Sequence, residues 1–314
     1  MKVAITGISS FLASELVPSI ESDKEITEIL GLDIIVPKYT SSKIKFVKRD
    51  VRDKKIFEDL KGYDAIIHLA FIVSPISNRR EMYSINLDGS KNVFNCAIKA
   101  GVKKIIHASS IAAYGAFPEN PIPITEEHPI RLMKKHFYYN ETKYYVEKYL
   151  DELSKKYPDV IITRIRPSIF LGPNINNFFR TYFLGKRIYT FSPDVLVQFT
   201  WINDVTEAFY LALKKDVSGA FNIGGDNPIS SKQIAERLGI KCVKFPYYFG
   251  LFLINTLYKL HILRNLTPGW IRATRYPIIV DSSRAKRILG WTPKYDTYGS
   301  VKALYDALKE SGEI

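Results

Sequence analysis

A tyrosine and a lysine four residues apart are the side chains of this sequence most suited to chemistry. Tyr139 and Lys143 open a segment of helical periodicity over residues 138–156, and residues four apart lie on one face of a helix. A tyrosine hydroxyl, with a pKa of about 10, is a poor base at neutral pH. A neighbouring ammonium favours the phenolate, so the pair is suited to moving a proton at a substrate hydroxyl or carbonyl.

The Tyr-x-x-x-Lys spacing carries little information alone. It occurs seven times, starting at Tyr39, Tyr139, Tyr144, Tyr182, Tyr210, Tyr298 and Tyr305. Only Tyr139 lies about thirty residues beyond a serine pair, Ser109-Ser110, that directly follows an apolar strand. A serine hydroxyl at that strand end would bond the same substrate oxygen as Tyr139. The competing interpretations are an exposed helix residue for Tyr139 and a strand-end cap for Ser110.

The first sixteen residues predict a strand, a tight turn and a helix. Residues 3–5 are a short apolar run, Thr6-Gly7 ends it, and apolar residues then recur at helical spacing. Free backbone N–H groups and the positive end of a helix dipole make such a turn a cradle for phosphate. The dinucleotide fingerprint places glycines where this sequence has Gly7, Ser10 and Ala13. Ser10 departs from it, because a serine side chain would crowd a pyrophosphate or bond to it; an ordinary strand-to-helix turn is the alternative.

An acid at the end of the second predicted strand bears on the choice of cofactor. Asp33 follows Gly7 by 26 residues and ends the strand over residues 29–33. A carboxylate near that distance accepts hydrogen bonds from the adenosine ribose hydroxyls and repels a 2′-phosphate. No arginine follows to bind that phosphate, so the sequence favours NAD over NADP. A helix or turn cap is an equally good interpretation of a lone aspartate.

Strands and helices alternate through the first half of the chain. Strands are predicted at 3–5, 29–33, 44–47, 65–70, 104–109 and 160–165, with intervening helices that include 82–100 and one starting at an Asp53 N-cap and running through Leu60. This alternation predicts an α/β fold with a parallel sheet covered on both faces. Ligands of such sheets lie at the carboxyl ends of the strands.

Composition narrows the functional classes. The formal charge is +13, from 45 Lys+Arg against 32 Asp+Glu, but the lysines are dispersed, which favours a lysine-rich surface over nucleic-acid binding. Cys96 and Cys242 are too few for a metal site or disulfide framework. No signal peptide is visible, which favours the cytoplasm.

The most apolar stretch, residues 245–258, is too short and interrupted for a transmembrane segment. A helix packed into the C-terminal part of the fold is favoured. The alternatives are a wall for an apolar substrate, or an interfacial membrane anchor beside Lys259, His261 and Arg264.

Taken together, the sequence resembles the extended short-chain dehydrogenase/reductase family, also called the NAD-dependent epimerase/dehydratase family. The resemblance runs nearly end to end. It is carried by Thr6-Gly7 with Phe11, Asp33, Asp50-Val51, His68-Leu69-Ala70, Asn86 with Gly89, Ser109-Ser110, Tyr114-Gly115, Tyr139 with Lys143 and Glu147, Arg166-Pro167, Gly172-Pro173, Asp204-Val205, and residues 221–224, 281–285 and 289–293.

The resemblance implies roles for individual residues. Tyr139 would be the general acid/base, Lys143 would bind the nicotinamide ribose and lower the tyrosine pKa, and Ser110 would polarise the substrate oxygen. Asn86 would have a structural role. The implied cofactor is NAD, with Asp50-Val51 at the adenine and Ala70 beside the dinucleotide. The implied cofactor-binding residues are Gly7, Ser9, Ser10, Phe11, Leu12, Asp33, Asp50, Val51, Leu69, Ala70, Tyr139, Lys143 and Pro167.

The resemblance also implies an architecture: a doubly wound parallel Rossmann-type sheet with a smaller C-terminal substrate-binding lobe. Residues 1–166 and about 199–223 would form the NAD-binding domain, and residues 167–198 and 224–314 the substrate lobe. Family members commonly form homodimers through the helices expected here at 82–100 and 138–156. The second carries Tyr144, Tyr145 and Tyr149, which we expect to be exposed.

The implied reaction is hydride transfer at a secondary alcohol or ketone, most often of a nucleotide sugar. Ile169, Val197 and Trp201 stand where nucleotide-sugar members usually carry asparagine, arginine and histidine, and losing the arginine removes a charge-assisted phosphate contact. The arginines considered as replacements are Arg180, Arg187, Arg272 and Arg275. These departures favour, as an alternative, a reductase or dehydrogenase of a more apolar alcohol, sterol-like or flavonol-like. A non-catalytic dinucleotide-binding protein is a third interpretation, motivated by Ser10.

Overall fold

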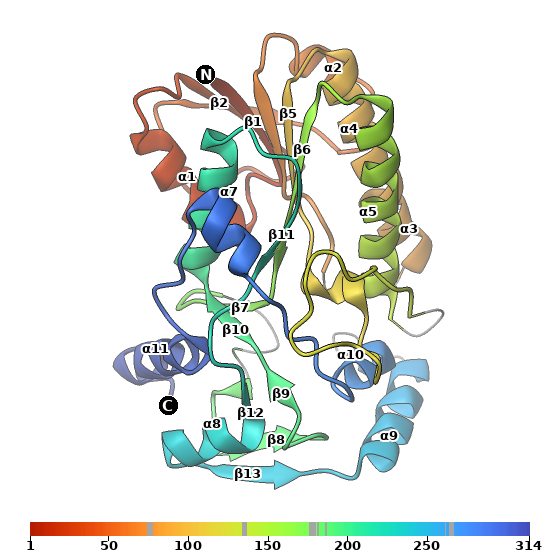
Figure 1. Ribbon diagram of the computed structural model, residues 1–314, viewed down its shortest axis with the longest axis vertical. Coiled ribbons are helices and arrows are strands. Elements are labelled where there is room, and N and C mark those ends of the chain that lie inside the picture. Colours follow the sequence, from red (N-terminus) through yellow and green to blue (C-terminus); the bar gives the residue numbers. More distant parts are fainter. Residues whose placement is uncertain are drawn as a thin grey trace.

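A parallel β-sheet with helices on both faces forms the larger part of the molecule (Figure 1). The computed structural model describes residues 1–73, 78–133, 137–175, 180, 182–185, 187–260, 262–263 and 267–314. Within them, the main sheet has seven strands in the order β11-β6-β5-β4-β1-β2-β3, all paired in parallel. The strands are β1 (Lys2–Thr6), β2 (Glu28–Asp33), β3 (Ile44–Lys48), β4 (Ala65–His68), β5 (Lys104–Ala108), β6 (Ile161–Pro167) and β11 (Gly219–Ile223). The predicted α/β fold with a Rossmann-type sheet is confirmed.

Two apolar cores lie on opposite faces of this sheet. The first packs α1 (Phe11–Ser22) and α7 (Ile202–Lys214) against the central strands, and the second packs α4 (Ser90–Lys99) and α5 (Tyr138–Lys156) against the other face (Figure 1). The inner strands are buried on both sides, which explains why they read in the sequence as continuous apolar runs.

Two helix predictions need correction. The helix expected from Asp53 to Leu60 is a single turn, α2 (Ile56–Asp59), and its N-cap is Lys55, which makes no side-chain cap bond. Asp53 instead accepts a hydrogen bond from the Lys55 N–H at 2.8 Å, an Asx-type turn that competes with the helix start. The helix expected over residues 82–100 begins earlier and changes pitch, as α3 (Arg79–Tyr83), a π-helical segment η1 (Ser84–Gly89) and α4.

The helix α5 agrees with its predicted bounds, but its tyrosines are less exposed than expected. Tyr145 is exposed, whereas Tyr144 and Tyr149 are half-buried, and the Tyr149 hydroxyl donates to Asn95 Oδ1 on α4 at 2.8 Å. The dimer prediction expected all three tyrosines to be exposed, and only Tyr145 is.

The rest of the chain after β6 forms a smaller assembly below the sheet in Figure 1. It contains three two-stranded sheets, with pairings β10-β7, β12-β9 and β13-β8, and an apolar cluster of its own. Its strands are β7 (Ile169–Leu171), β8 (Arg187–Thr190), β9 (Leu196–Val197), β10 (Phe199–Trp201), β12 (Ile229–Ser230) and β13 (Lys241–Lys244); its helices are α8 (Ser231–Leu238), α9 (Tyr247–Lys259), α10 (Pro268–Ala273) and α11 (Thr297–Glu310). A short π-helical segment, η3 (Ala285–Leu289), returns to pack against α7.

Among the described residues, no helix is both long enough and apolar enough to cross a membrane.

Candidate active site

The turn after β1 is built around a glycine that no other residue can replace without strain. Gly7 has φ +72°, and a Cβ there would lie 2.6 Å from the backbone nitrogen of Ala70 and 2.8 Å from its Cα. The Gly7 N–H donates to the Leu32 carbonyl at 2.8 Å, which fixes the turn to β2. The turn thus reaches the start of α1 while touching the ends of both neighbouring strands.

The amino-terminal end of α1 presents free donors, and Ser10 does not occupy them. Ser10 is the N-cap of the helix: its Oγ accepts from the Ala13 N–H at 3.3 Å. The N–H groups of Phe11 and Leu12 make no hydrogen bond among the described residues. Two unpaired N–H groups at the positive end of a twelve-residue helix suit a pyrophosphate, so the residues present fit a dinucleotide.

Two carboxylates stand where the adenosine half of a dinucleotide was predicted to lie. Asp33 accepts from the N–H groups of Ser9 at 3.0 Å and Ile35 at 3.2 Å, which holds its carboxylate beside the turn. Asp50 is bound by the Arg52 guanidinium in two bonds of 2.6 and 2.9 Å, and this bonding lowers the pKa of Asp50. Backbone N–H groups therefore orient the Asp33 carboxylate, and Arg52, which was not predicted from the sequence, orients the Asp50 carboxylate.

Buried hydrogen bonds hold the loop that follows β4, which includes Leu69 and Ala70. Asn86 accepts from the Ile72 N–H at 2.7 Å and donates to the Ile72 carbonyl at 2.9 Å, a structural contact of the kind expected. His68 joins the Thr6 hydroxyl at 2.6 Å and the Ser90 hydroxyl at 2.9 Å. Burial lowers the pKa of His68 to about 3, so its ring is neutral and serves to connect the elements.

Replacing Gly7 by alanine is expected to weaken both the fold and dinucleotide binding. Gly101 provides a matched control, because it has a similar φ of +85° but no atom within 4 Å of the place that an added methyl group would take. Gly101→Ala should cost about 1–2 kcal/mol of unfolding free energy from backbone strain alone. Gly7→Ala should cost more, and should raise the Kd for NAD by about tenfold or more because the clash displaces the donors. Equal effects of the two substitutions in urea denaturation and NAD titration would contradict this account of the turn.

The predicted catalytic hydroxyls meet at the carboxyl end of β5. Ser110 caps a short 3₁₀ helix, η2 (Ile111–Tyr114), by accepting from the Ala112 N–H at 3.1 Å. Burial raises the pKa of Tyr139 to about 12, and the nearby Ser110 side chain lowers it by a smaller amount. Ser110 is therefore both the strand-end cap and a neighbour of Tyr139. Ser109 is separate from this pair, because its hydroxyl donates to Glu147 at 2.5 Å.

Lys143 lies beside the tyrosine, with its Nζ 5.7 Å from the centroid of the Tyr139 ring. The side chain is 2% exposed, Nζ donates to the Ala108 carbonyl at 2.6 Å and it lies 3.4 Å from the Phe71 ring centroid. Burial lowers the pKa of Lys143 to about 7. In this geometry Lys143 does not contribute to the pKa of Tyr139, because Nζ donates to a carbonyl, and the expectation that it lowers that pKa stays a prediction.

Aromatic rings enclose Tyr139, and one of them, Trp270, could not be predicted from the sequence. The Trp270 ring of α10 stacks on the Tyr139 ring, with centroids 5.6 Å apart and an interplanar angle of 24°. Phe71 and Phe137 contact it at 5.9 and 6.0 Å. Because Trp270 is separated from Tyr139 by more than a hundred residues, no local pattern could have placed it there.

A buried ion pair supports α5 one turn beyond Lys143. Arg166, at the end of β6, donates from Nε and Nη2 to the two Glu147 oxygens, both at 2.7 Å, and from Nη1 to the Tyr114 hydroxyl at 2.7 Å. These bonds hold the pKa of Glu147 at about 2 in spite of burial. Pro167 follows directly and pairs with Ile223 of β11, beside the same strand ends.

A protein-family model matches most of the chain. The model described as "NAD dependent epimerase/dehydratase family" matches residues 3–224, which include the turn at Gly7 and the Ser110, Tyr139 and Lys143 set. The chain belongs to this family.

Relatives within and near the epimerase/dehydratase family differ in what they act on. A UDP-glucose 4-epimerase of Lactobacillus helveticus is 26% identical, covering 96% of this chain and 95% of the relative. A 3beta-hydroxysteroid-dehydrogenase/decarboxylase isoform 1 of Arabidopsis thaliana is also 26% identical, covering 94% and 72%. The crystal structure of a Bacillus cereus UDP-glucuronic acid 4-epimerase in complex with NAD has a TM-score of 0.75, with 19% identity over 99% of both chains. This last similarity is one of fold.

Apolar side chains occupy the three positions at which nucleotide-sugar members of the family usually carry asparagine, arginine and histidine. Ile169, Val197 and Trp201 all pack against the core of the smaller lobe. Of the arginines considered as replacements, Arg180 donates to the Glu313 carboxylate at 2.6 Å and Arg275 lies over the rings of three tyrosines. Because Arg180 and Arg275 already have partners within the protein, neither is an evident replacement for the arginine that binds phosphate in nucleotide-sugar members.

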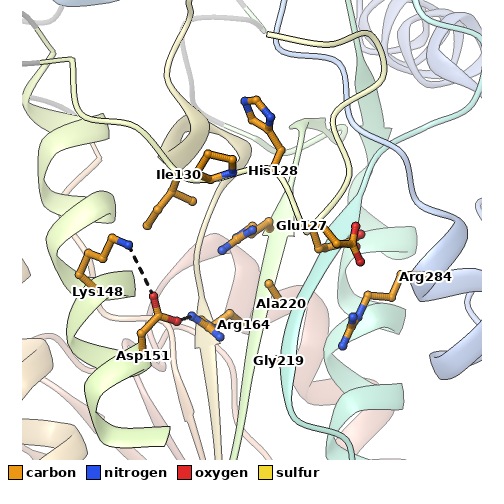
Figure 2. A pocket seen from close by; sticks show the side chains of 12 residues that line it. Glu127, His128, Ile130, Lys148, Asp151, Arg164, Gly219, Ala220 and Arg284 are labelled. Atoms are coloured by element: carbon orange, nitrogen blue, oxygen red, sulfur yellow. Dashed lines mark hydrogen bonds and ion pairs between the residues drawn. The ribbon is translucent and has the colours of Figure 1, made fainter. Parts of the chain in front are cut away.

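A cavity of about 330 Å³ lies between α5, β6 and β11 (Figure 2). Arg166 is among the residues that line it. Three of its charged residues are joined: Asp151 lies 4.0 Å from Lys148 Nζ and also accepts from Arg164 (Figure 2). None of the predicted catalytic or cofactor residues lines this cavity.

Proposed function

We propose that the protein is an NAD-dependent oxidoreductase of the epimerase/dehydratase type that acts at a secondary alcohol or ketone. The observation that carries this proposal is the placement of Tyr139 at the carboxyl end of β5, near Ser110 and with Lys143 Nζ 5.7 Å from the centroid of its ring. β5 lies two strands from β1, whose turn at Gly7 offers unpaired N–H groups to a pyrophosphate. A dinucleotide bound there would extend across the strand ends toward Tyr139.

The chain's own residues would handle the proton of the reaction. Ser110 holds the substrate oxygen and Tyr139 gives or takes its proton. NAD, when bound, supplies a hydride acceptor at the adjacent carbon. The raised pKa of Tyr139 favours the protonated hydroxyl, so the tyrosine is ready to donate to a carbonyl and needs the Lys143 ammonium nearer to it in order to act as a base. A dinucleotide ribose that drew Lys143 Nζ away from the Ala108 carbonyl would bring this about.

The proposed cofactor is NAD rather than NADP. The Asp33 carboxylate is fixed beside the turn by two backbone N–H groups, so its charge cannot easily move away from an adenosine ribose. That arrangement accepts hydrogen bonds from a free 2′-hydroxyl and repels a 2′-phosphate.

The leading substrate class is a nucleotide sugar. It is supported by the UDP-glucose 4-epimerase among the relatives and by the overall likeness to a UDP-sugar epimerase. The second candidate is a more apolar alcohol or ketone. It is favoured by the aromatic rings around Tyr139, by the apolar cluster at Ile169, Val197 and Trp201, and by the steroid dehydrogenase among the relatives.

Thermal unfolding with candidate ligands separates the two classes. A ligand at about a hundred times its Kd stabilises the folded state by about 2.7 kcal/mol, which raises the Tm by several degrees. We expect NAD alone to raise the Tm, and NAD with a UDP- or dTDP-sugar to raise it further. A response to apolar ketones with NAD, and none to any nucleotide sugar, would select the second candidate. Failure of NAD itself to bind would overturn the proposed function.

A further inference from the structure

The helix α9 carries a face of large apolar side chains that the fold does not cover. In the described part of the chain, α9 buries only Gly250 and Ile254, where Gly250 lies against the Phe191 ring. The exposed fractions of Tyr248, Phe249 and Phe252 are 70%, 59% and 68%. The exposed apolar residues of α9 and its flanks, named here the α9 patch, are Phe245, Tyr248, Phe249, Phe252, Leu253, Tyr258, Leu260 and Ile262. The sequence-based preference for a helix packed into the smaller lobe is therefore correct for one side of α9 only.

The position of α9 leaves this face free. Figure 1 shows α9 at an outer corner of the smaller lobe, with α10 on its inner side. The exposed side chains at 248, 249, 252 and 253 follow the three- and four-residue spacing of one helix face. Monomeric proteins rarely expose a continuous apolar surface of this kind unless a membrane or another molecule covers it.

The charge around the α9 patch is of one sign. No aspartate or glutamate occurs between Glu236 and Asp281, while this stretch is rich in lysine and arginine. Lys241, Lys244, Lys259 and Arg275 are exposed. Arg275 lies over the rings of Tyr247 and Tyr248, at 5.4 and 5.7 Å from their centroids, so cations and aromatic rings occur side by side. Two residues of the expected anchor, His261 and Arg264, lie outside the described residues.

The length of α9 decides how it would meet a bilayer. Its 13 residues span about 20 Å, which is well short of the about 30 Å of a hydrocarbon core. An aromatic face bordered by cations, on a helix too short to cross, is typical of a helix that lies in the membrane interface. We propose that α9 docks flat on the surface of an anionic lipid bilayer, with the α9 patch inserted and the flanking lysines and arginines at the phosphate groups.

This docking would bring the membrane close to the candidate active site. α10 packs on α9 and carries Trp270, whose ring stacks on Tyr139. The α9–α10 pair thus joins the proposed lipid surface to the catalytic tyrosine through aromatic contacts. If the proposed function holds, a substrate with a membrane-dissolved part is the class best placed to use this arrangement.

Vesicle sedimentation tests the docking independently of any reaction. The probes are vesicles of phosphatidylcholine alone and vesicles of equal parts phosphatidylcholine and phosphatidylglycerol, each mixed with the full chain. We expect binding to the mixed vesicles, weaker binding to the neutral ones, and a loss of binding as salt is added, because salt screens the lysine–phosphate attraction. The double substitution Phe249→Ser/Phe252→Ser should reduce partitioning by about tenfold or more, since each phenylalanine is inserted only in the bound state.

A matched control tests whether any exposed apolar pair has the same effect. Ile35 and Val36 are 63% and 64% exposed, close to the values for the two phenylalanines, and lie on the sheet side of the molecule. Ile35→Ser/Val36→Ser should leave vesicle binding unchanged, while Lys244→Glu/Lys259→Glu should weaken it on anionic vesicles. Absence of binding by the unaltered chain, or an equal loss in the Ile35/Val36 variant, would overturn the proposal. The proposal would also be overturned if sedimentation velocity showed that the chain is a dimer and that Phe249→Ser/Phe252→Ser separates it into monomers. The α9 patch would then be buried between two copies of the chain.

Discussion

Replacing Tyr139 by phenylalanine is expected to lower kcat by about 10²–10⁴, the usual contribution of a positioned acid/base group. The substitution removes the only hydroxyl of this ring and leaves its contacts with Trp270, Phe71 and Phe137 in place. Because burial raises the pKa of Tyr139, the hydroxyl is neutral at neutral pH, and its removal changes no charge in the fold. The variant should therefore bind NAD normally and unfold at an unchanged or slightly higher temperature, which separates a chemical defect from a structural one.

Tyr144→Phe is the matched control for this experiment. Tyr144 lies on the same helix and shares the Tyr-x-x-x-Lys spacing with Lys148, whose Nζ lies 5.8 Å from the Tyr144 ring. It is not one of the predicted catalytic residues, so its replacement should leave kcat within about twofold of the unaltered enzyme, as is usual for a substitution outside the site. Turnover of the Tyr139 variant within about tenfold of the unaltered enzyme would exclude the proposed acid/base role. A protein that binds NAD and turns over no alcohol or ketone even with Tyr139 present would favour the non-catalytic alternative.

The sheet could be predicted from the sequence because its strands are buried on both faces. Continuous apolar runs such as residues 65–68 need no partner information to be read as parallel strands, and the intervening helices fix the alternation. The same reasoning placed Gly7 and Ser110 at strand ends, since the carboxyl ends of parallel strands share one edge. Predictions from the local sequence pattern were least accurate where two local structures compete. Asp53 is an example, because its carboxylate favours a turn over the start of a longer helix.

The surroundings of the site could not be predicted, because they depend on contacts between distant segments. Trp270 comes from the smaller lobe, and Arg166 reaches Glu147 from a neighbouring strand end. The direction of the shift in the Tyr139 pKa also depends on such contacts. Helical spacing places Lys143 on the same face of the helix as Tyr139, but it cannot show that Lys143 Nζ donates to the Ala108 carbonyl. Spacing therefore predicts which residues lie close together, whereas packing determines their charge states.

Replacing Glu147 by leucine is expected to cost about 3–5 kcal/mol of unfolding free energy, because it leaves the Arg166 guanidinium buried without a counter-charge. Glu147 is fully buried and accepts both the Nε and Nη2 bonds of Arg166, while Arg166 is itself only 5% exposed. Glu147→Gln keeps the shape and one acceptor oxygen, so it should cost less than the leucine variant and more than a surface change. Asp306→Asn provides the comparison, because it removes an exposed pair with Lys302 and should cost less than about 1 kcal/mol.

The pH dependence of these variants tests the charge rather than the packing. The pKa of Glu147 is lowered to about 2 in the folded state from its ordinary 4.5, so its contribution to stability is complete above pH 4.5 and is lost as the pH falls toward 2. Urea denaturation across that range should therefore show the difference between the unaltered chain and Glu147→Gln shrinking as the solution is acidified. Other carboxylates of lowered pKa, such as Asp23, titrate in both proteins and cancel in the difference. A difference that stayed constant with pH would mean that hydrogen bonding and shape, and not the Glu147 charge, hold α5 against β6 beneath Lys143 and the candidate active site.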